Sequence, residues 1–192
     1  YIYYYKNYIC KNNASMVEEL GEETYQKLVR CILMIQHKVS DENKNIKLTG
    51  NFVSYRGSVL NWCPIGRDST FEGREFFVEL DNREKVRRKL MDRIKLLTVS
   101  REINGVSISM GGKTSLDFYP VGWDKTYALK YFKNKKPWFV GDRCGENGND
   151  KEIYDILAKH RRGFATTGTN KTAIIIKKII EEIKNDLQNR IG

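Results

Sequence analysis

The stretch that decides the fold is residues 46–65, which read IKLTGNFVSYRGSVLNWCPI. Apolar and polar side chains alternate on both sides of Gly57-Ser58, and a two-residue turn with glycine first joins antiparallel strands. Residues 46–56 and 59–65 are therefore predicted to form a hairpin. Because successive side chains point to opposite faces, it has an apolar face (Val53, Tyr55, Leu60 and Trp62) and a polar face (Ser54, Arg56 and Asn61).

A second hairpin is predicted at residues 106–119, with strands 106–110 and 114–119 around Gly111-Gly112-Lys113. In its second strand Ser115, Asp117 and Tyr119 share one face, whereas Leu116 and Phe118 share the other. Helical spacing of apolar residues predicts helices at 21–38 and from about residue 83 to 97, with a polar loop at 68–73. With a strand at residues 1–5, this order predicts a mainly antiparallel sheet with helices on one face.

The pattern changes near Pro120. The sequence predicts a short helix from Asp124, a buried parallel strand at 137–140, a helix from Asp150 and a strand at 163–166. A final helix from about residue 170 carries apolar residues along one face: Ala173, Ile176, Ile180, Ile183 and Leu187. Alternating strands and helices indicate an α/β arrangement, so a boundary between two regions is expected near Val121.

Composition excludes several classes of protein. The chain has 192 residues and a net charge of +10. No apolar run is long enough to cross a bilayer and no signal peptide is visible, so no membrane association is expected. Four scattered cysteines without a CxxC pair, and two histidines, favour a reduced intracellular protein without zinc. The positive charge lies mostly on predicted helices without interleaved aromatic residues, so nucleic acid is not an expected partner.

Three arginines are candidates for anion binding. Arg56 lies on the polar face of the first hairpin, Arg67 follows it closely, and Arg74 comes seven residues later. Converging guanidinium groups bind phosphate strongly, because their planar forks match pairs of phosphate oxygens. Ser115 and Asp117 on one strand face suit hydrogen bonds to sugar hydroxyls. The alternative, which spacing alone favours, is that all of these are ordinary solvated side chains.

A metal site is the third candidate. Asp142 follows the predicted strand at 137–140, and Asn149 and Asp150 precede a helix. Carboxylates at the carboxyl end of a parallel strand lie where open α/β sheets bind ligands, and these oxygen donors suit magnesium. Helix capping by Asp150 and turn formation by Asp142 explain the same residues equally well.

Several strings, in order, resemble eukaryotic-type phosphomannomutases of the haloacid-dehalogenase (HAD) superfamily. They are 56-RGSVLN-61, 64-PIGR-67, 72-EGREF-76, 111-GGKTSLD-117, 122-GWDK-125, and 141-GD-142 with 148-GND-150. The resemblance implies an α/β protein: an α+β cap with an antiparallel sheet at residues 1–120, which binds substrate and dimerises, and the C-terminal part of a HAD-like core at 121–192. The resemblance covers the chain from its first residues to about Gly163, and more loosely to the end.

The resemblance also implies roles for the candidate residues. Arginines matching Arg56, Arg67 and Arg74 hold the phosphate and sugar of a hexose phosphate, and residues matching Ser115 and Asp117 contact the same substrate. Lys125 matches the core lysine that steadies the active-site aspartate and the phosphoryl charge. Asp142 matches a magnesium ligand, with Asn149 and Asp150 supporting that loop.

The implied function is interconversion of mannose 6-phosphate and mannose 1-phosphate for GDP-mannose synthesis. The implied enzyme is a cytoplasmic homodimer joined through its caps, uses Mg²⁺ and a hexose bisphosphate activator, and acts on mannose or glucose phosphate. Transfer through a phospho-aspartate divides one hard step into two. The family's Asp-x-Asp motif has no counterpart in this chain, so the chain alone is expected to be inactive. The alternatives are a HAD-type sugar phosphatase and a non-catalytic fragment that binds sugar phosphate or dimerises.

Overall fold

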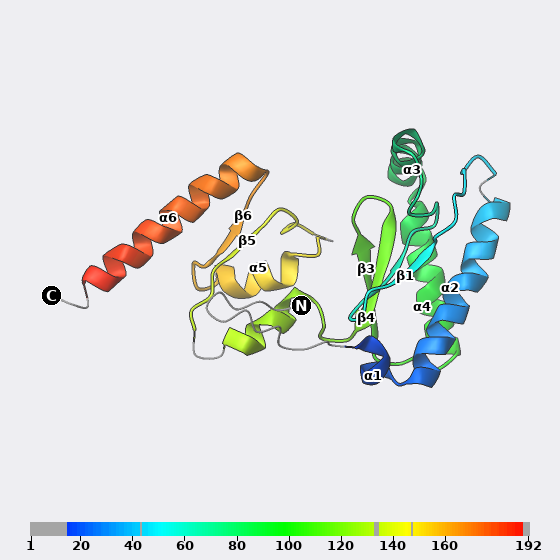
Figure 1. Ribbon diagram of the computed structural model, residues 1–192, viewed down its shortest axis with the longest axis horizontal. Coiled ribbons are helices and arrows are strands. Elements are labelled where there is room, and N and C mark those ends of the chain that lie inside the picture. The colour runs from blue at the N-terminus through cyan, green and yellow to red at the C-terminus, as the bar shows by residue number, and fades with distance from the viewer. Residues whose placement is uncertain (1–14, 43, 133–134, 147, 190–192) are drawn as a thin grey trace. The chain divides into compact units, whose positions relative to one another are not determined.

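The computed structural model describes residues 15–42, 44–132, 135–146 and 148–189. The chain divides into two compact units, Tyr1–Asp124 and Lys125–Gly192 (Figure 1). The strand predicted at residues 1–5 lies outside the described residues. No helix among the described residues has the length and apolar character needed to span a bilayer.

The first unit contains an antiparallel sheet, as predicted, with four strands among the described residues. Its elements are α1 (Met16–Leu20), α2 (Glu22–Glu42), β1 (Val53–Tyr55), β2 (Leu60–Trp62), α3 (Phe71–Glu84), α4 (Val86–Ser100), β3 (Val106–Gly111) and β4 (Ser115–Pro120). The strands lie in the order β1-β2-β4-β3. The two predicted hairpins therefore meet through β2 and β4, with Asn61 paired to Asp117.

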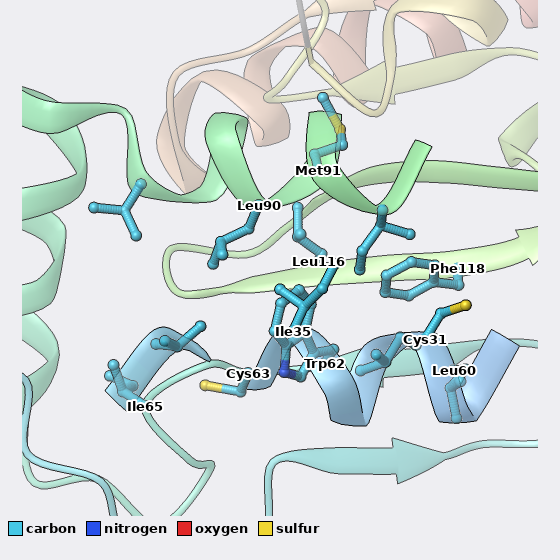
Figure 2. Close-up of a cluster of buried hydrophobic side chains, with 14 of the residues drawn as sticks. Cys31, Ile35, Leu60, Trp62, Cys63, Ile65, Leu90, Met91, Leu116 and Phe118 are labelled. Carbon is cyan, nitrogen blue, oxygen red and sulfur yellow. The ribbon is translucent and has the colours of Figure 1, made fainter. Parts of the chain in front are cut away.

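The core of this unit lies between the sheet and the helices α2 and α4. Alternate residues of β2 and β4 are fully buried there, namely Leu60, Trp62, Leu116 and Phe118. They belong to one cluster with the apolar faces of the two helices, which contribute Leu28, Ile32, Ile35, Leu90 and Ile94. Figure 2 shows part of this cluster, including Ile35 and Leu90. Because side chains alternate along a strand, burial of this face leaves the polar face on the other side of the sheet.

The strands of the first hairpin are shorter than predicted. Gly57, with φ 79°, occupies the predicted turn, and Arg56 N donates to Val59 O at 2.9 Å. The regular ladder ends at Trp62, because Gly50 and Asn51 have positive φ and therefore interrupt the extended chain opposite. Residues 46–52 and 63–65 still lie side by side, since Cys63 N donates to Phe52 O and Thr49 N to Ile65 O.

Helix α3 begins inside the segment predicted to be a loop, so that part of the prediction is wrong. Thr70 is its N-cap and accepts a hydrogen bond from Gly73 N at 3.2 Å. Phe77 and Leu80 are the buried apolar residues of α3. Such a sparse apolar pattern gives a weak helical signal, and the cap and the packing of Phe77 decide the conformation.

The cap of α3 leads to a first prediction. We expect Thr70→Ala to lower the free energy of unfolding by about 1 kcal/mol, because it removes the acceptor for Gly73 N at the start of the helix. Urea unfolding followed by circular dichroism measures this change. Thr70→Ser keeps the hydroxyl and serves as the control. An alanine variant as stable as the serine variant would contradict the assignment of the cap.

The second unit has an α/β arrangement, as predicted. It contains the 3₁₀ helix η1 (Lys125–Phe132), β5 (Phe139–Gly141), α5 (Lys151–Ala158), β6 (Gly163–Ala165) and α6 (Thr169–Gln188). Strands β5 and β6 pair in parallel, with α5 as the connection between them. Phe139 and Val140 are half-buried, whereas the sequence predicted a fully buried strand. The reason is that β5 pairs with β6 alone in the described part of the chain, so it lies at an edge of the sheet.

The apolar face predicted for the last helix is present but exposed. Its larger members, Ile176, Ile180, Ile183 and Leu187, are between 41% and 54% exposed. Ile179, outside that predicted set, is the buried residue among those described in α6. Helical periodicity fixes which residues share a face, whereas burial requires a second surface against that face.

Candidate functional site

A row of polar side chains crosses the face of the sheet that points away from α2 and α4. The strand register places Ser54, Asn61, Asp117 and Ser109 opposite one another in turn. Asn61 is 3% exposed, and its amide links three other polar groups. Its Nδ2 donates to Ser115 Oγ at 3.0 Å and to Asp117 Oδ1 at 2.6 Å, while its Oδ1 accepts from Arg67 Nη1 at 2.6 Å.

The loop after β2 brings Arg67 to this row. Gly66 has φ 89°, and a Cβ added there would lie 2.2 Å from Gly50 O. Glycine is therefore required at this close crossing of two chain segments. Arg67 N donates to Asn51 O at 3.2 Å, which fixes the backbone, and the exposed guanidinium then reaches Asn61.

Arg74, near the N-terminus of α3, lies beside Arg67. Its guanidinium donates to Arg67 O, to Ser69 O at 3.2 Å and to Thr114 Oγ1 at 3.3 Å. Thr114 is buried and directly precedes β4. The hydrogen bonds therefore join Arg67 and Arg74 to the strand that carries Ser115 and Asp117.

Arg56 lies apart from this network. It follows β1 directly, and alternation along that strand places it on the same face as Ser54. It is exposed, and no hydrogen bond of its guanidinium is found within the described part of the chain. Hydrogen bonds thus connect four of the five predicted substrate-binding residues, and Arg56 is the one outside.

Gly111 allows the close packing around Asp117. A Cβ at Gly111 would lie 2.7 Å from the Asp117 carboxylate, so a larger residue would displace that side chain. Ser115 Oγ donates to Gly111 O at 2.8 Å. The result is a carboxylate, a hydroxyl and two guanidinium groups on one surface. Such a set can bind a phosphorylated sugar, since the cations match phosphate oxygens and the carboxylate accepts from hydroxyls.

A second polar cluster lies in the second unit around Asp150. This residue is 1% exposed; its carboxylate accepts from Lys125 Nζ and from Arg143 N, the latter at 3.0 Å. Burial raises the pKa of the Asp150 carboxyl, but Lys125 and the backbone N–H groups of Arg143 and Asp142 outweigh it, so the net pKa is below its ordinary value. A Cβ at Gly141 would lie 2.6 Å from Asp150 Oδ2, so this position too needs glycine.

A cavity of about 600 Å³ opens beside this cluster. Its polar lining includes Lys125, Asp142, Asp150, Thr166 and Thr172. Asp142 is exposed and follows β5 directly, at the carboxyl end of the parallel pair. That edge is where open α/β sheets bind their ligands.

A comparison with protein-family models identifies the family of this chain. The model of the family "Eukaryotic phosphomannomutase" matches residues 2–182. This chain belongs to the eukaryotic phosphomannomutase family. The family's enzymes are HAD-type isomerases, and the antiparallel sheet with its small parallel pair fits part of the phosphomannomutase fold.

Individual phosphomannomutases align over most of this chain. It is 38% identical over 164 residues to a phosphomannomutase of Encephalitozoon cuniculi, covering 82% of this chain and 60% of that protein. It is 34% identical over 170 residues to the Schizosaccharomyces pombe protein, covering 87% of this chain and 63% of that protein. It is 38% identical over 146 residues to the Drosophila melanogaster protein, covering 73% of this chain and 54% of that protein. The chain thus spans about three-fifths of the length of the phosphomannomutases it matches.

HAD families such as the phosphomannomutases generally use Mg²⁺, an ion that prefers oxygen donors. Asn149 Oδ1 is buried and lacks a hydrogen-bond partner among the described residues, an unfavourable state unless it binds a cation or water. With the exposed Asp142 it offers hard oxygen donors. Asp150 is already bonded to Lys125. No group of three His, Cys, Asp or Glu side chains suited to a metal occurs among the residues described.

Asn61 is the site residue whose importance the sequence did not reveal. Alternation placed Asn61 on the polar face, but no role was predicted for it, and in the structure its side chain is buried. The signal that could have identified it is register: once Leu116 and Phe118 are set opposite Trp62 and Leu60, Asn61 must lie opposite Asp117. That pairing joins residues 56 positions apart, which no local pattern specifies.

Proposed function

We propose that this chain forms the cap and part of the core of a phosphomannomutase that interconverts mannose 6-phosphate and mannose 1-phosphate. The observation that carries the proposal is the hydrogen-bonded cluster of Arg67, Arg74, Ser115 and Asp117 around Asn61. It gathers, on one face of the first unit, the side chains that match the family's substrate-binding motif. Family membership supports the same reading.

In the proposed substrate complex, the phosphate lies against Arg67 and Arg74. Asn61 accepts a hydrogen bond from one N–H of Arg67, so the other N–H groups of that guanidinium are available to phosphate oxygens. Asp117 and Ser115 bind the sugar hydroxyls, and Arg56, in the turn after β1, also binds the hexose phosphate. Glucose phosphate offers the same groups and is the second expected substrate.

In the core unit, Lys125 would neutralise negative charge near the transferred phosphoryl group, held in place by the Asp150 carboxylate. Asp142 and Asn149 would hold Mg²⁺, with Asp150 supporting their loop, and the ion would offset charge on phosphoryl oxygens. A cap that excludes water protects a phospho-aspartate from hydrolysis. No Asp-x-Asp occurs in the 192 residues.

The proposal is tested by titrating mannose 1-phosphate into the chain and into Arg67→Ala, using calorimetry. We expect Arg67→Ala to weaken binding roughly tenfold or more, the effect of losing charge-assisted hydrogen bonds. Arg83→Ala is the matched control, because Arg83 is 72% exposed and pairs with Glu84 on the surface. Equal affinities of the wild type and Arg67→Ala would refute the assignment of the site.

A non-catalytic sugar-phosphate-binding chain is the second candidate, because these 192 residues contain no Asp-x-Asp. Incubation with mannose 1-phosphate, Mg²⁺ and a hexose bisphosphate activator distinguishes the outcomes. Mannose 6-phosphate indicates a mutase, and inorganic phosphate alone indicates a HAD-type sugar phosphatase. We expect no turnover from this polypeptide.

We further propose a cytoplasmic homodimer joined through the first unit, as the family resemblance implies. The outer surface of α2 and α4 exposes apolar side chains that would suit such an interface, namely Leu33, Met34, Leu96 and Val99. Between these helices lies a hollow of about 370 Å³ lined in part by Met34, Leu96 and Leu97. Sedimentation equilibrium at micromolar concentration separates a dimer from a monomer.

A further inference from the structure

A buried ion pair joins α3 to α4 outside the residues assigned to substrate. Arg87 Nε donates to Asp81 Oδ2 at 2.7 Å, and the two side chains are 14% and 10% exposed. Arg87 N also donates to Asp81 Oδ1 at 2.7 Å. The Asp81 carboxylate therefore caps the N-terminus of α4, where a negative charge is favourable, and at the same time holds the Arg87 guanidinium.

Arg87 reaches beyond Asp81 to the turn between β3 and β4. Its Nη1 lies 3.2 Å from Gly112 O and 3.4 Å from Ser115 O. These two carbonyl groups flank the turn residues Lys113 and Thr114. One guanidinium thus ties both ends of the turn to the junction of the two helices.

The same turn carries groups of the candidate site. Thr114 Oγ1 accepts from Arg74, and Ser115 Oγ accepts from Asn61. A shift of the turn would therefore move Thr114 and Ser115 away from the arginines. Since a buried ion pair seldom stabilises more than an apolar pair of similar size, its presence here suggests a role in geometry.

We propose that Asp81 and Arg87 are positioning residues, which fix the β3–β4 turn and thereby hold Ser115 and Thr114 in place for sugar-phosphate binding. This inference rests on the proposed binding function. Neither side chain touches the substrate in the proposed complex. Lysine cannot replace Arg87, because an ammonium group lacks the planar fork that bonds to a carboxylate in one direction and to carbonyl groups in another.

The test uses the whole chain and mannose 1-phosphate as the probe, with calorimetry at a temperature where circular dichroism shows each variant folded. We expect Arg87→Lys and Asp81→Asn each to weaken binding roughly three- to tenfold, the effect of losing about one hydrogen bond. Arg83→Lys, the same exchange in a surface ion pair, should bind like the wild type.

Nuclear magnetic resonance supplies a readout that loss of stability alone would not change. In folded Arg87→Lys, the Asn61 side-chain amide and the Gly112 and Ser115 backbone amides should shift, whereas these signals should not change in Arg83→Lys. If Arg87→Lys does not fold, Asp81→Asn, which keeps the shape of the side chain, carries the test.

The outcomes separate this inference from the function it depends on. If Arg67→Ala loses affinity but folded Arg87→Lys and Asp81→Asn bind like the wild type, the positioning role is overturned and the binding site stands. If the wild type does not bind, or Arg67→Ala binds equally well, the proposed function fails and this inference fails with it.

Discussion

Replacing Trp62 by alanine is expected to lower the free energy of unfolding of the first unit by about 3–5 kcal/mol, the usual loss for a large buried side chain. Trp62 is fully buried between the sheet and the helices (Figure 2). Its Nε1 donates to Gln36 Oε1 at 2.6 Å, and Gln36 Nε2 donates to Pro64 O at 3.0 Å. The substitution therefore opens a cavity and also leaves the buried Gln36 amide without its donor.

The contribution of the hydrogen bond can be measured separately with Trp62→Phe. Phenylalanine keeps much of the apolar volume but cannot donate to Gln36, so a loss of about 1–3 kcal/mol is expected. Urea unfolding followed by circular dichroism at 222 nm measures both variants. Equal stabilities of Trp62→Phe and the wild type would show that the bond to Gln36 contributes nothing. A loss below about 1 kcal/mol in Trp62→Ala would contradict the placement of this core.

Asn61→Asp is expected to destabilise the first unit by about 2 kcal/mol at neutral pH and to weaken mannose 1-phosphate binding at least roughly tenfold. The new carboxylate would occupy the position of an amide that now donates to Asp117 at 2.6 Å. Two acceptors would then face each other, and Arg67, which bonds to the other oxygen, offsets only part of their repulsion.

The charge makes this effect depend on pH. In Asn61→Asp the folded state holds two adjacent carboxylates, so it takes up a proton more readily than the unfolded chain does. The stability difference from the wild type should therefore be largest near pH 7 and should shrink as the pH falls towards about 4. Asn61→Leu removes the same hydrogen bonds without adding a second carboxylate, so its deficit should change less over that range. A constant deficit in Asn61→Asp would mean that Asn61 and Asp117 are not neighbours.

These two residues show how the fold positions the site. Trp62 and Asn61 are adjacent on β2, and alternation along the strand sends one into the core and the other to the polar face. Packing of Trp62 therefore sets the position from which Asn61 reaches Arg67, Ser115 and Asp117. A mutation in the core is expected to disturb binding without touching a substrate-binding residue.

Much of the fold and part of the site could be predicted from the sequence alone. Alternation in residues 46–65 and 106–119 predicted both hairpins and their faces, and helical spacing predicted α2 and α4. The order of elements after Pro120 predicted the parallel strands β5 and β6. The motif strings gave the family and named the candidate residues. These features are local, since a strand or helix imposes its period on neighbouring residues.

Tertiary structure decided the rest. Asn61 joins residues up to 56 positions away, Arg87 reaches a turn 25 positions on, and Asp150 bonds to Lys125 across the same separation. The apolar face of α6 is exposed although its period is regular. In each case the outcome depends on which surfaces meet, and the pairing of distant segments is set by strand register and core packing rather than by any local period.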